Sequence, residues 1–343
     1  MNKLCLIIVT CLISTGLAKA QQHYLELDPA CAGTKSPFTK VQVIDNLSEK
    51  QLIGYVQKGV LNRVEKIYYA GTLPVTLGKF FTWGSKSGTK EKNLVVVLNE
   101  LFLSENTHEF SETGRFRLSL RLFNQNDNGK FREILDVDSV FTVKGLDVTK
   151  RLLRSVNEQF CAIAQQAASV KPNELDNKEE HLLEDLYKLD SLDKLQIPLY
   201  TSNALARGIY KDYNHLKMNT PNDDSEIIID AKKPDKVKIY KVYKANNRKI
   251  QLKSEGIYAV CDGKRLYKAT SRNFYEIQKL GSDFYYDRPA ILSESNTGGI
   301  VGAAAFGLMG GIVGSALSET QSKTYRFKIN HRRGNAIPVA MVY

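Results

Sequence analysis

The chain has 343 residues, of which 43% are hydrophobic and 25% are charged, a composition that indicates a globular protein and excludes a largely disordered one. Lysine and arginine number 48 against 37 aspartate and glutamate residues, which gives a net charge of +11. Because a single core seldom grows beyond about 250–300 residues, this length predicts two domains.

Residues 1–20 have the sequence of a secretory signal peptide. A short basic start precedes the apolar run Leu4 to Ala18, and Ala18-Lys19-Ala20 supplies a small-x-small cleavage site. An uncleaved anchor helix is the alternative, but the polar residues 21–23 lack a basic flank that would stop transfer. We therefore expect an exported protein of the periplasm or cell envelope.

Cleavage would remove two lysines and leave 46 basic against 37 acidic residues, a net charge of +9. An exported basic protein meets anionic lipid headgroups or acidic polymers rather than nucleic acid. Solubility alone is the alternative explanation of this charge.

Residues 21–170 predict an α+β domain with a mainly antiparallel sheet and packed helices. Arg115 to Leu122 alternates strictly, which places Phe116 and the following leucines inward and the arginines outward. A turn sequence at 124–129 and a return strand at 131–143 complete a hairpin. Apolar residues three or four apart then predict a helix across the sheet: Val148, Leu152, Val156, Phe160, Ile163 and Ala167. This layout is similar to that of periplasmic accessory domains of envelope transport systems, a likeness of architecture only.

Three cysteines remain after processing: Cys31, Cys161 and Cys261. An oxidising compartment permits one bridge among them, and a Cys31–Cys161 disulfide would close the first domain. Buried single thiols are the alternative.

Residues 171–236 predict an acidic linking helix followed by a loop. The helix has an amphipathic stripe that Pro198 ends, formed by Leu182, Leu186, Leu189, Leu192 and Leu195.

Residues 237–343 predict a β-rich domain, a meander or small barrel-like sheet, in which Asp262-Gly263 is a hairpin signal. The segments Gly256 to Lys264, Phe274 to Ile277 and Phe284 to Tyr286 resemble uncharacterised exported proteins of Bacteroidetes bacteria over roughly 237–343. That resemblance implies no known activity.

Basic residues are dense between positions 232 and 253. Among them we expect Lys236, Lys238, Lys241 and Lys244 to contact an anionic surface, such as phosphate-bearing lipid. Protection of a sheet edge against aggregation, or exposure to solvent alone, is the alternative explanation of these lysines.

Residues 295–318 form an uncharged, glycine-rich segment inserted in this β-rich domain. Small residues recur at every fourth position: Gly299, Ala303, Gly307, Gly311 and Ser315. On a helix they would form one face that another backbone can approach closely. In water, seven glycines would cost this helix about 6–7 kcal/mol relative to alanine. A single membrane span, a membrane-inserting or self-associating hairpin, and packing within the fold are the alternatives.

The sequence has no recognisable catalytic or metal-binding motif, since none of the five histidines stands at metal-ligand spacing. We therefore expect no catalytic residue, metal or cofactor. The leading hypothesis is a non-catalytic envelope protein that uses residues 295–318 for membrane association or self-association. A soluble periplasmic ligand-binding or chaperone-like module, in which the segment only packs, is the alternative, and an enzyme comes third.

Overall fold

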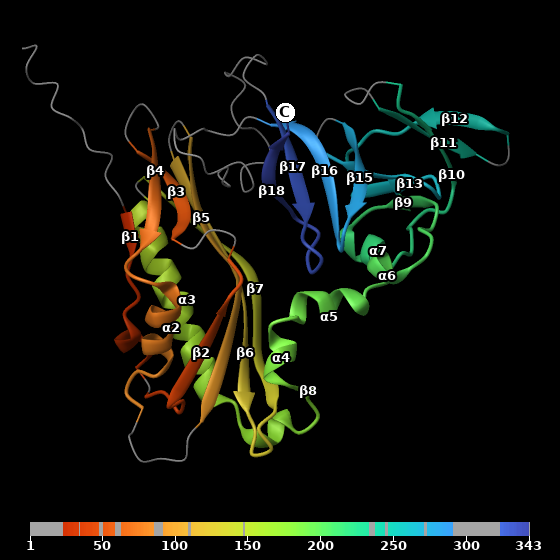
Figure 1. Ribbon diagram of the computed structural model, residues 1–343. Coiled ribbons are helices and arrows are strands. Elements are labelled where there is room, and N and C mark those ends of the chain that lie inside the picture. The colour runs from red at the N-terminus through yellow and green to blue at the C-terminus, as the bar shows by residue number, and fades with distance from the viewer. Residues whose placement is uncertain are drawn as a thin grey trace, which may run out of the picture.

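A computed structural model describes two lobes, the first at the left of Figure 1 and the second at the right. The described residues are 23–33, 35–47, 51–58, 63–85, 92–108, 111–146, 148–232, 237–243, 246–270, 273–290 and 323–342. The expected signal peptide, residues 1–20, and the glycine-rich segment, residues 295–318, lie outside them.

An eight-stranded sheet forms the first lobe. Its order is β1-β4-β3-β5-β6-β7-β8, and β2 also pairs with β5. The long strands β5, β6 and β7 are antiparallel, whereas β2 and β3 run parallel to β5 and occupy successive parts of its edge. The strands are β1 His23–Leu25, β2 Lys40–Asp45, β3 Leu52–Lys58, β4 Arg63–Tyr69, β5 Asn93–His108, β6 Ser111–Gln125, β7 Phe131–Gly145 and β8 Glu180–His181.

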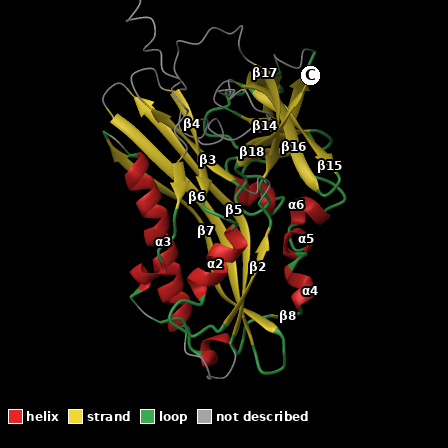
Figure 2. Cartoon of the chain, turned by 60° about the vertical axis from the view of Figure 1, so that its left-hand side comes forward, coloured by secondary structure: helices red, strands yellow, loops and turns green. Residues whose placement is uncertain are grey.

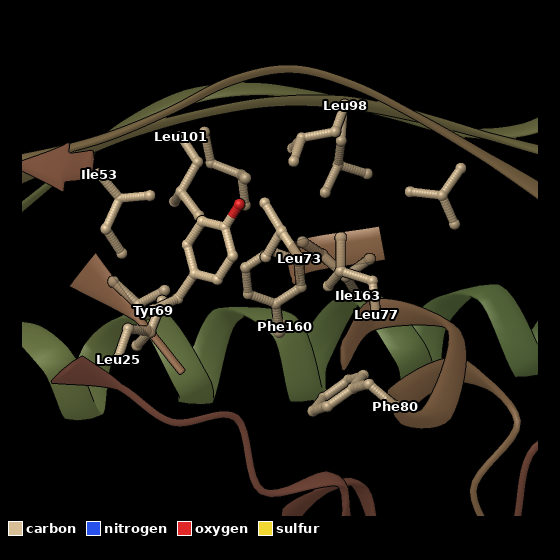
Figure 3. Packing of buried hydrophobic residues seen from close by; sticks show 14 of the residues in the cluster. Leu25, Ile53, Tyr69, Leu73, Leu77, Phe80, Leu98, Leu101, Phe160 and Ile163 are labelled. Atoms are coloured by element: carbon tan, nitrogen blue, oxygen red, sulfur yellow. The ribbon is translucent and has the colours of Figure 1, made fainter. Parts of the chain in front are cut away.

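One face of this sheet is covered by α2 (Leu73–Phe81) and α3 (Thr149–Ser169) (Figure 2). The apolar stripe predicted for the second of these helices is buried along its length. In Figure 3, Phe160 of α3 points toward the sheet, and its ring packs edge-on against Phe80 of α2 with centroids 6.0 Å apart. This face is the dry core of the first lobe.

The linking segment differs from its prediction. Instead of one acidic helix, the chain forms the 3-10 helix Pro172–Leu175, strand β8 and the short helices α4 (Leu183–Leu186) and α5 (Leu189–Leu195). Tertiary contacts explain the break, because β8 pairs with the first residues of β7, while Leu186 and Leu189 pack on Phe123 and Phe131. A continuous helix would forfeit these contacts.

The second lobe is a seven-stranded sheet in the order β18-β17-β16-β15-β14-β13-β9. Strands β13 to β18 adjoin in chain order, as a meander does, and the Asp262-Gly263 turn lies between β13 and β14. The strands are β9 Gly208–Tyr210, β13 Ala259–Cys261, β14 Leu266–Ala269, β15 Phe274–Leu280, β16 Asp283–Ala290, β17 Lys323–Ile329 and β18 Ala336–Val342.

Other elements cover both faces of the β9–β14 end of this sheet. Helices α6 (Pro198–Thr201) and α7 (Tyr213–Lys217) contribute Leu199, Tyr200 and Leu216 to one apolar cluster. A small sheet of β10 (Glu226–Asp230), β11 (Lys238–Tyr243) and β12 (Arg248–Gln251) packs Ile227 and Ile239 on the other face. Strand β9 and both helices precede residue 237 in the chain.

The predicted α+β class was wrong. Among the described residues, 45% lie in strands and 22% in helices, so the protein is β-rich, with several sheets. Two causes account for the error: the expected acidic helix is divided into short pieces, and the three central strands of the first lobe reach 15 or 16 residues. None of the helices in the described part of the chain is long and apolar enough to cross a membrane.

Candidate functional site

A cleft of about 1020 Å³ lies between the two lobes and is the candidate functional site. Its walls are residues 135–139 of β7, helix α5, and residues 331–333 of the turn that joins β17 to β18. Leu135, Val137 and Leu192 contribute apolar surface, whereas charged side chains line most of the remainder. The arginines among them have carboxylate partners.

On the first lobe, the arginine face of β6 points outward as predicted, but it meets protein there. Arg117 is only 7% exposed, and its Nε lies 3.2 Å from Oε1 of Glu100. Arg121 contacts Glu133 Oε2 at 2.5 Å and both carboxylate oxygens of Asp193 at 3.2 Å. The alternation therefore identified the correct face, while the covering element came from a distant part of the chain.

The β17–β18 turn of the second lobe carries three consecutive basic residues into the cleft, His331, Arg332 and Arg333. Arg332 is ion-paired with Asp136, and Nε of Arg333 lies 2.6 Å from Oδ2 of Asp138. Both aspartates belong to β7. One turn thus connects the second lobe to the sheet of the first.

His331 occupies the point where the turn meets α5. The side chain is 8% exposed, with Nδ1 3.2 Å from Asp190 Oδ1 and Nε2 3.6 Å from Asp193 Oδ2. Its backbone carbonyl accepts a 2.7 Å hydrogen bond from the hydroxyl of Tyr213. The imidazole is therefore held between two carboxylates, at the boundary of the lobes.

Gly334 allows this turn to pack closely on α7. Its φ is +72°, and a Cβ there would lie 2.0 Å from Cγ of Tyr213. The Tyr258 hydroxyl also donates a hydrogen bond to the carbonyl of Gly334. A side chain at this position would displace the ring that anchors His331.

A second charged group fixes α5 to the second lobe. Lys194 is 5% exposed and reaches Asp283 Oδ1 at 2.8 Å as well as Asp190, while Lys328 reaches the other oxygen of Asp283 at 2.9 Å. Because α5 also contacts Arg121 of β6, it connects both lobes through ion pairs. Burial makes these pairs sensitive to the loss of either partner.

Two carboxyl groups in these clusters have shifted pKa values. Burial raises the pKa of Asp193, but the nearby His331 and the charges of Arg121 and Arg332 outweigh it, so the pKa is lowered overall. Burial acts likewise on Asp283, and its hydrogen bonds to Lys194 and Lys328 again lower the pKa. Both groups therefore favour the ionised state at neutral pH.

Within the part of the chain that the structure describes, no group of three or more His, Cys, Asp or Glu side chains is arranged to hold a metal ion. The arginines of the cleft have carboxylate partners. This arrangement suits a polar interface between lobes, with room for a ligand that replaces water.

The structure describes two of the four lysines that were expected to contact an anionic surface. Lys236 and Lys244 lie outside the described residues. Lys238 is exposed at the start of β11, whereas Lys241 is ion-paired with Asp223. Three positions apart on a strand, the two side chains point to opposite faces. The anionic-surface contact of the four lysines stays a prediction.

The small-residue row Gly299, Ala303, Gly307, Gly311 and Ser315 lies outside the described residues, so its predicted role stays a prediction. Cys161 is disulfide-bonded, and its Sγ lies 3.8 Å from the carbonyl oxygen of Asp28, next to the 3-10 helix Pro29–Ala32 that contains Cys31. The Cys31 side chain is not described, and the Cys31–Cys161 pairing remains a prediction. Cys261 is a buried free thiol.

Sequence reasoning missed the residues that build the cleft. No motif in the sequence marks Arg332 and Arg333, and Asp190 and Asp193 fall within the expected acidic helix. Two sequence patterns of opposite charge could have indicated the cleft. One is the run of three basic residues in a single turn, and the other is Asp136 and Asp138 on one face of a strand. Each pattern alone is common on surfaces, and only the fold brings them together.

No protein-family model matches the chain, and no curated protein matches it. Two solved structures are similar to part of it. One, an uncharacterized protein, is 11% identical, with a TM-score of 0.25, and the match covers 44% of this chain and 97% of that one. The other, protein XCC0632 from Xanthomonas campestris, of the family DUF330, is 10% identical, with a TM-score of 0.25, and covers 43% and 90%. Similarity this low supports no conclusion about function.

Proposed function

We propose that the protein is a non-catalytic, exported protein of the cell envelope, and that residues 295–318 serve membrane association or self-association. The observation that supports this proposal is the pairing of β16 with β17. Ala290 and Lys323 are ladder partners, so the chain leaves the sheet and returns to it at the same point.

This register discriminates among the alternatives for the segment. A single span would place its two ends about 30 Å apart, on opposite sides of the hydrocarbon core. Antiparallel ladder partners have Cα atoms only about 5 Å apart. Ala290 and Lys323, the described residues that flank 291–322, therefore lie on the same side, which favours an inserted or self-associating hairpin over one crossing.

Replacement of residues 291–322 tests the proposal without disturbing the sheet. Because the ends are ladder partners, an Asn-Gly turn can close β16 onto β17 as a two-residue hairpin. We expect the full chain to remain with membranes after a carbonate wash or to sediment as an oligomer, and the Asn-Gly variant to be monomeric and extractable. Identical behaviour of both proteins in both assays would overturn the proposal.

A matched pair of substitutions separates the small-residue face from general apolarity. Gly307→Leu adds bulk to the row Gly299, Ala303, Gly307, Gly311 and Ser315, whereas Ala304→Leu adds similar bulk outside it. Both changes raise apolarity. If close backbone contact matters, only the first should weaken association.

The cleft favours a second candidate, a periplasmic ligand-binding module. Its volume of about 1020 Å³ is at the upper end of the usual range for small-molecule sites, roughly 300–1,000 Å³. Leu192→Trp would place a larger side chain on the apolar wall and so fill part of the cleft. Native mass spectrometry of the protein from cell extracts should then show a bound small molecule that this variant lacks, and an empty cleft in both would exclude the candidate.

A further inference from the structure

Two cations of the second lobe lie on one face of its sheet without a carboxylate between them. Lys268 is two residues beyond Leu266 on β14, and Arg288 is two residues beyond Tyr286 on β16. Leu266 pairs with Ile277, which pairs with Tyr286, and β14 and β16 run in the same direction. Lys268 and Arg288 therefore share one row, two strand spacings or roughly 10 Å apart.

Aromatic rings support each cation from the outer side. Lys268 Nζ lies 3.8 Å from the centroid of the Tyr258 ring, and the Arg288 guanidinium carbon lies 4.6 Å from that of Phe327. Tyr275, the ladder partner of Lys268, belongs to β15, the strand between them. The two cations thus have aromatic rings on their outer sides, and Tyr275 lies between them in the same row.

Lys268 and Arg288 each have an N–H group without a hydrogen-bond acceptor among the described residues. Lys268 Nζ donates to the carbonyls of Tyr258 at 3.2 Å and Ala269 at 2.9 Å, which leaves one of its three hydrogens. Nε of Arg288 is buried and has no hydrogen-bond partner. Among the described residues, no carboxylate lies within ion-pair distance of either cation. Half-buried like charges are costly unless an anion compensates them.

We propose that Lys268 and Arg288 form a binding site for a phosphate monoester group. Two positive charges match the −1.5 to −2 charge of such a group at pH 7, whereas a carboxylate would leave one cation uncompensated. A guanidinium fork and an ammonium point charge also suit a tetrahedral oxyanion with several acceptor oxygens.

The protonation of Lys268 supplies an independent signature. Burial, together with the charge of Arg288, lowers the pKa of Lys268 to about 8. A bound dianion favours the charged ammonium and would raise this pKa again. Binding at pH 8 should therefore take up protons, which calorimetry in buffers of different ionisation enthalpy measures directly.

The test compares the full chain in inorganic phosphate and in chloride of equal ionic strength. We expect phosphate to raise the unfolding temperature of the wild type more than chloride does. Lys268→Met and Arg288→Met should each raise the phosphate dissociation constant at least about tenfold, the effect of losing one charge-assisted hydrogen bond. Arg288→Lys, which keeps the charge, should fall between, and Lys253→Met, which removes an exposed lysine, should match the wild type.

Folding of the two methionine variants is checked in chloride, where removal of an uncompensated cation should leave the unfolding temperature equal or higher. Equal phosphate affinity in wild type and Lys268→Met, or no phosphate effect beyond that of chloride, would overturn the site. Flotation with phosphatidylcholine vesicles, with and without phosphatidic acid, identifies the source: capture by the acidic vesicles that free phosphate reverses indicates a lipid headgroup. Calorimetric binding without capture indicates a soluble phosphate.

Discussion

The two faces of the first-lobe sheet are made by the same strands and stabilised in different ways. One face of β6 buries Phe116, Leu118 and Leu120 under α3 and α2, where hydrophobic burial of about 25 cal/mol per Å² accumulates with no directional demand. The other face carries Arg117 and Arg121, which meet carboxylates from their own sheet and from α5. The same alternation therefore produced a dry core and a charged interface.

The two faces of the sheet therefore respond differently to substitutions and to solvent conditions. An apolar face excludes water, and the free energy of unfolding falls steeply when one of its side chains is truncated. An ion-paired face next to a cleft of about 1020 Å³ has water close to its charges, and salt and pH both act on it. Changes at three sites, in order of decreasing expected effect on the free energy of unfolding, test this difference between the two faces.

The largest effect is expected on the dry face. Phe160→Ala removes a fully buried ring that packs on Phe80, and should lower the free energy of unfolding of the first lobe by about 3–5 kcal/mol in urea titration. Glu158→Ala, an exposed position on the same helix, is the control and should stay within about 0.5 kcal/mol. A loss below about 1 kcal/mol for Phe160→Ala would mean that this face is not the stabilising core.

Sequence patterns were informative where a single element explains its own residues. The period of α3 and the alternation of β6 depend on local geometry, and both buried faces follow from them. The Asp262-Gly263 turn is equally local, since Gly263 has a φ of +93° and the Asp262 carboxylate accepts from the amides of residues 264 and 265. These features needed no knowledge of distant contacts.

Sequence patterns did not predict the structure where it depends on contacts between segments that are far apart in the chain. The leucine stripe of residues 182–195 is helical in period, yet β8 and the contacts of Leu186 and Leu189 divide it. The candidate cleft depends on Arg332 meeting Asp136, residues that are far apart in the chain and individually unremarkable. Tertiary pairing of this kind leaves no period in the sequence, so neither the β-rich class nor the interlobe site was predicted.

The charged face should show a smaller effect and a dependence on salt. Arg332→Met combined with Arg333→Met removes both ion pairs between the β17–β18 turn and β7, and should cost about 1–2 kcal/mol. The single tryptophan, Trp83, is in the first lobe, so its fluorescence reports that lobe while circular dichroism reports both. The two unfolding transitions should coincide in the wild type and separate in the double variant.

Salt provides the discriminating control for this double variant. At about 1 M salt, where the Debye length is about 3 Å, the wild type should approach the variant, which itself should change little. Lys249→Met combined with Lys253→Met removes the same charge from exposed positions and should behave as the wild type. Transitions that stay coincident in the Arg332/Arg333 variant would show that the lobes are coupled by other contacts.

The smallest effect is expected from acid titration of Asp193. Its pKa is lowered in the folded protein, so the stability that it contributes is complete above the unfolded value of about 4 and is lost as pH falls through the folded value. The free energy of unfolding of the wild type should therefore exceed that of Asp193→Asn at pH 7, and the difference should shrink below about pH 4. Asp224→Asn, at an exposed site, should show no such convergence. If the difference stayed constant down to pH 3, the Asp193 carboxylate would act by packing rather than by charge. The contrast between the two faces of the sheet would then lose its electrostatic basis at α5.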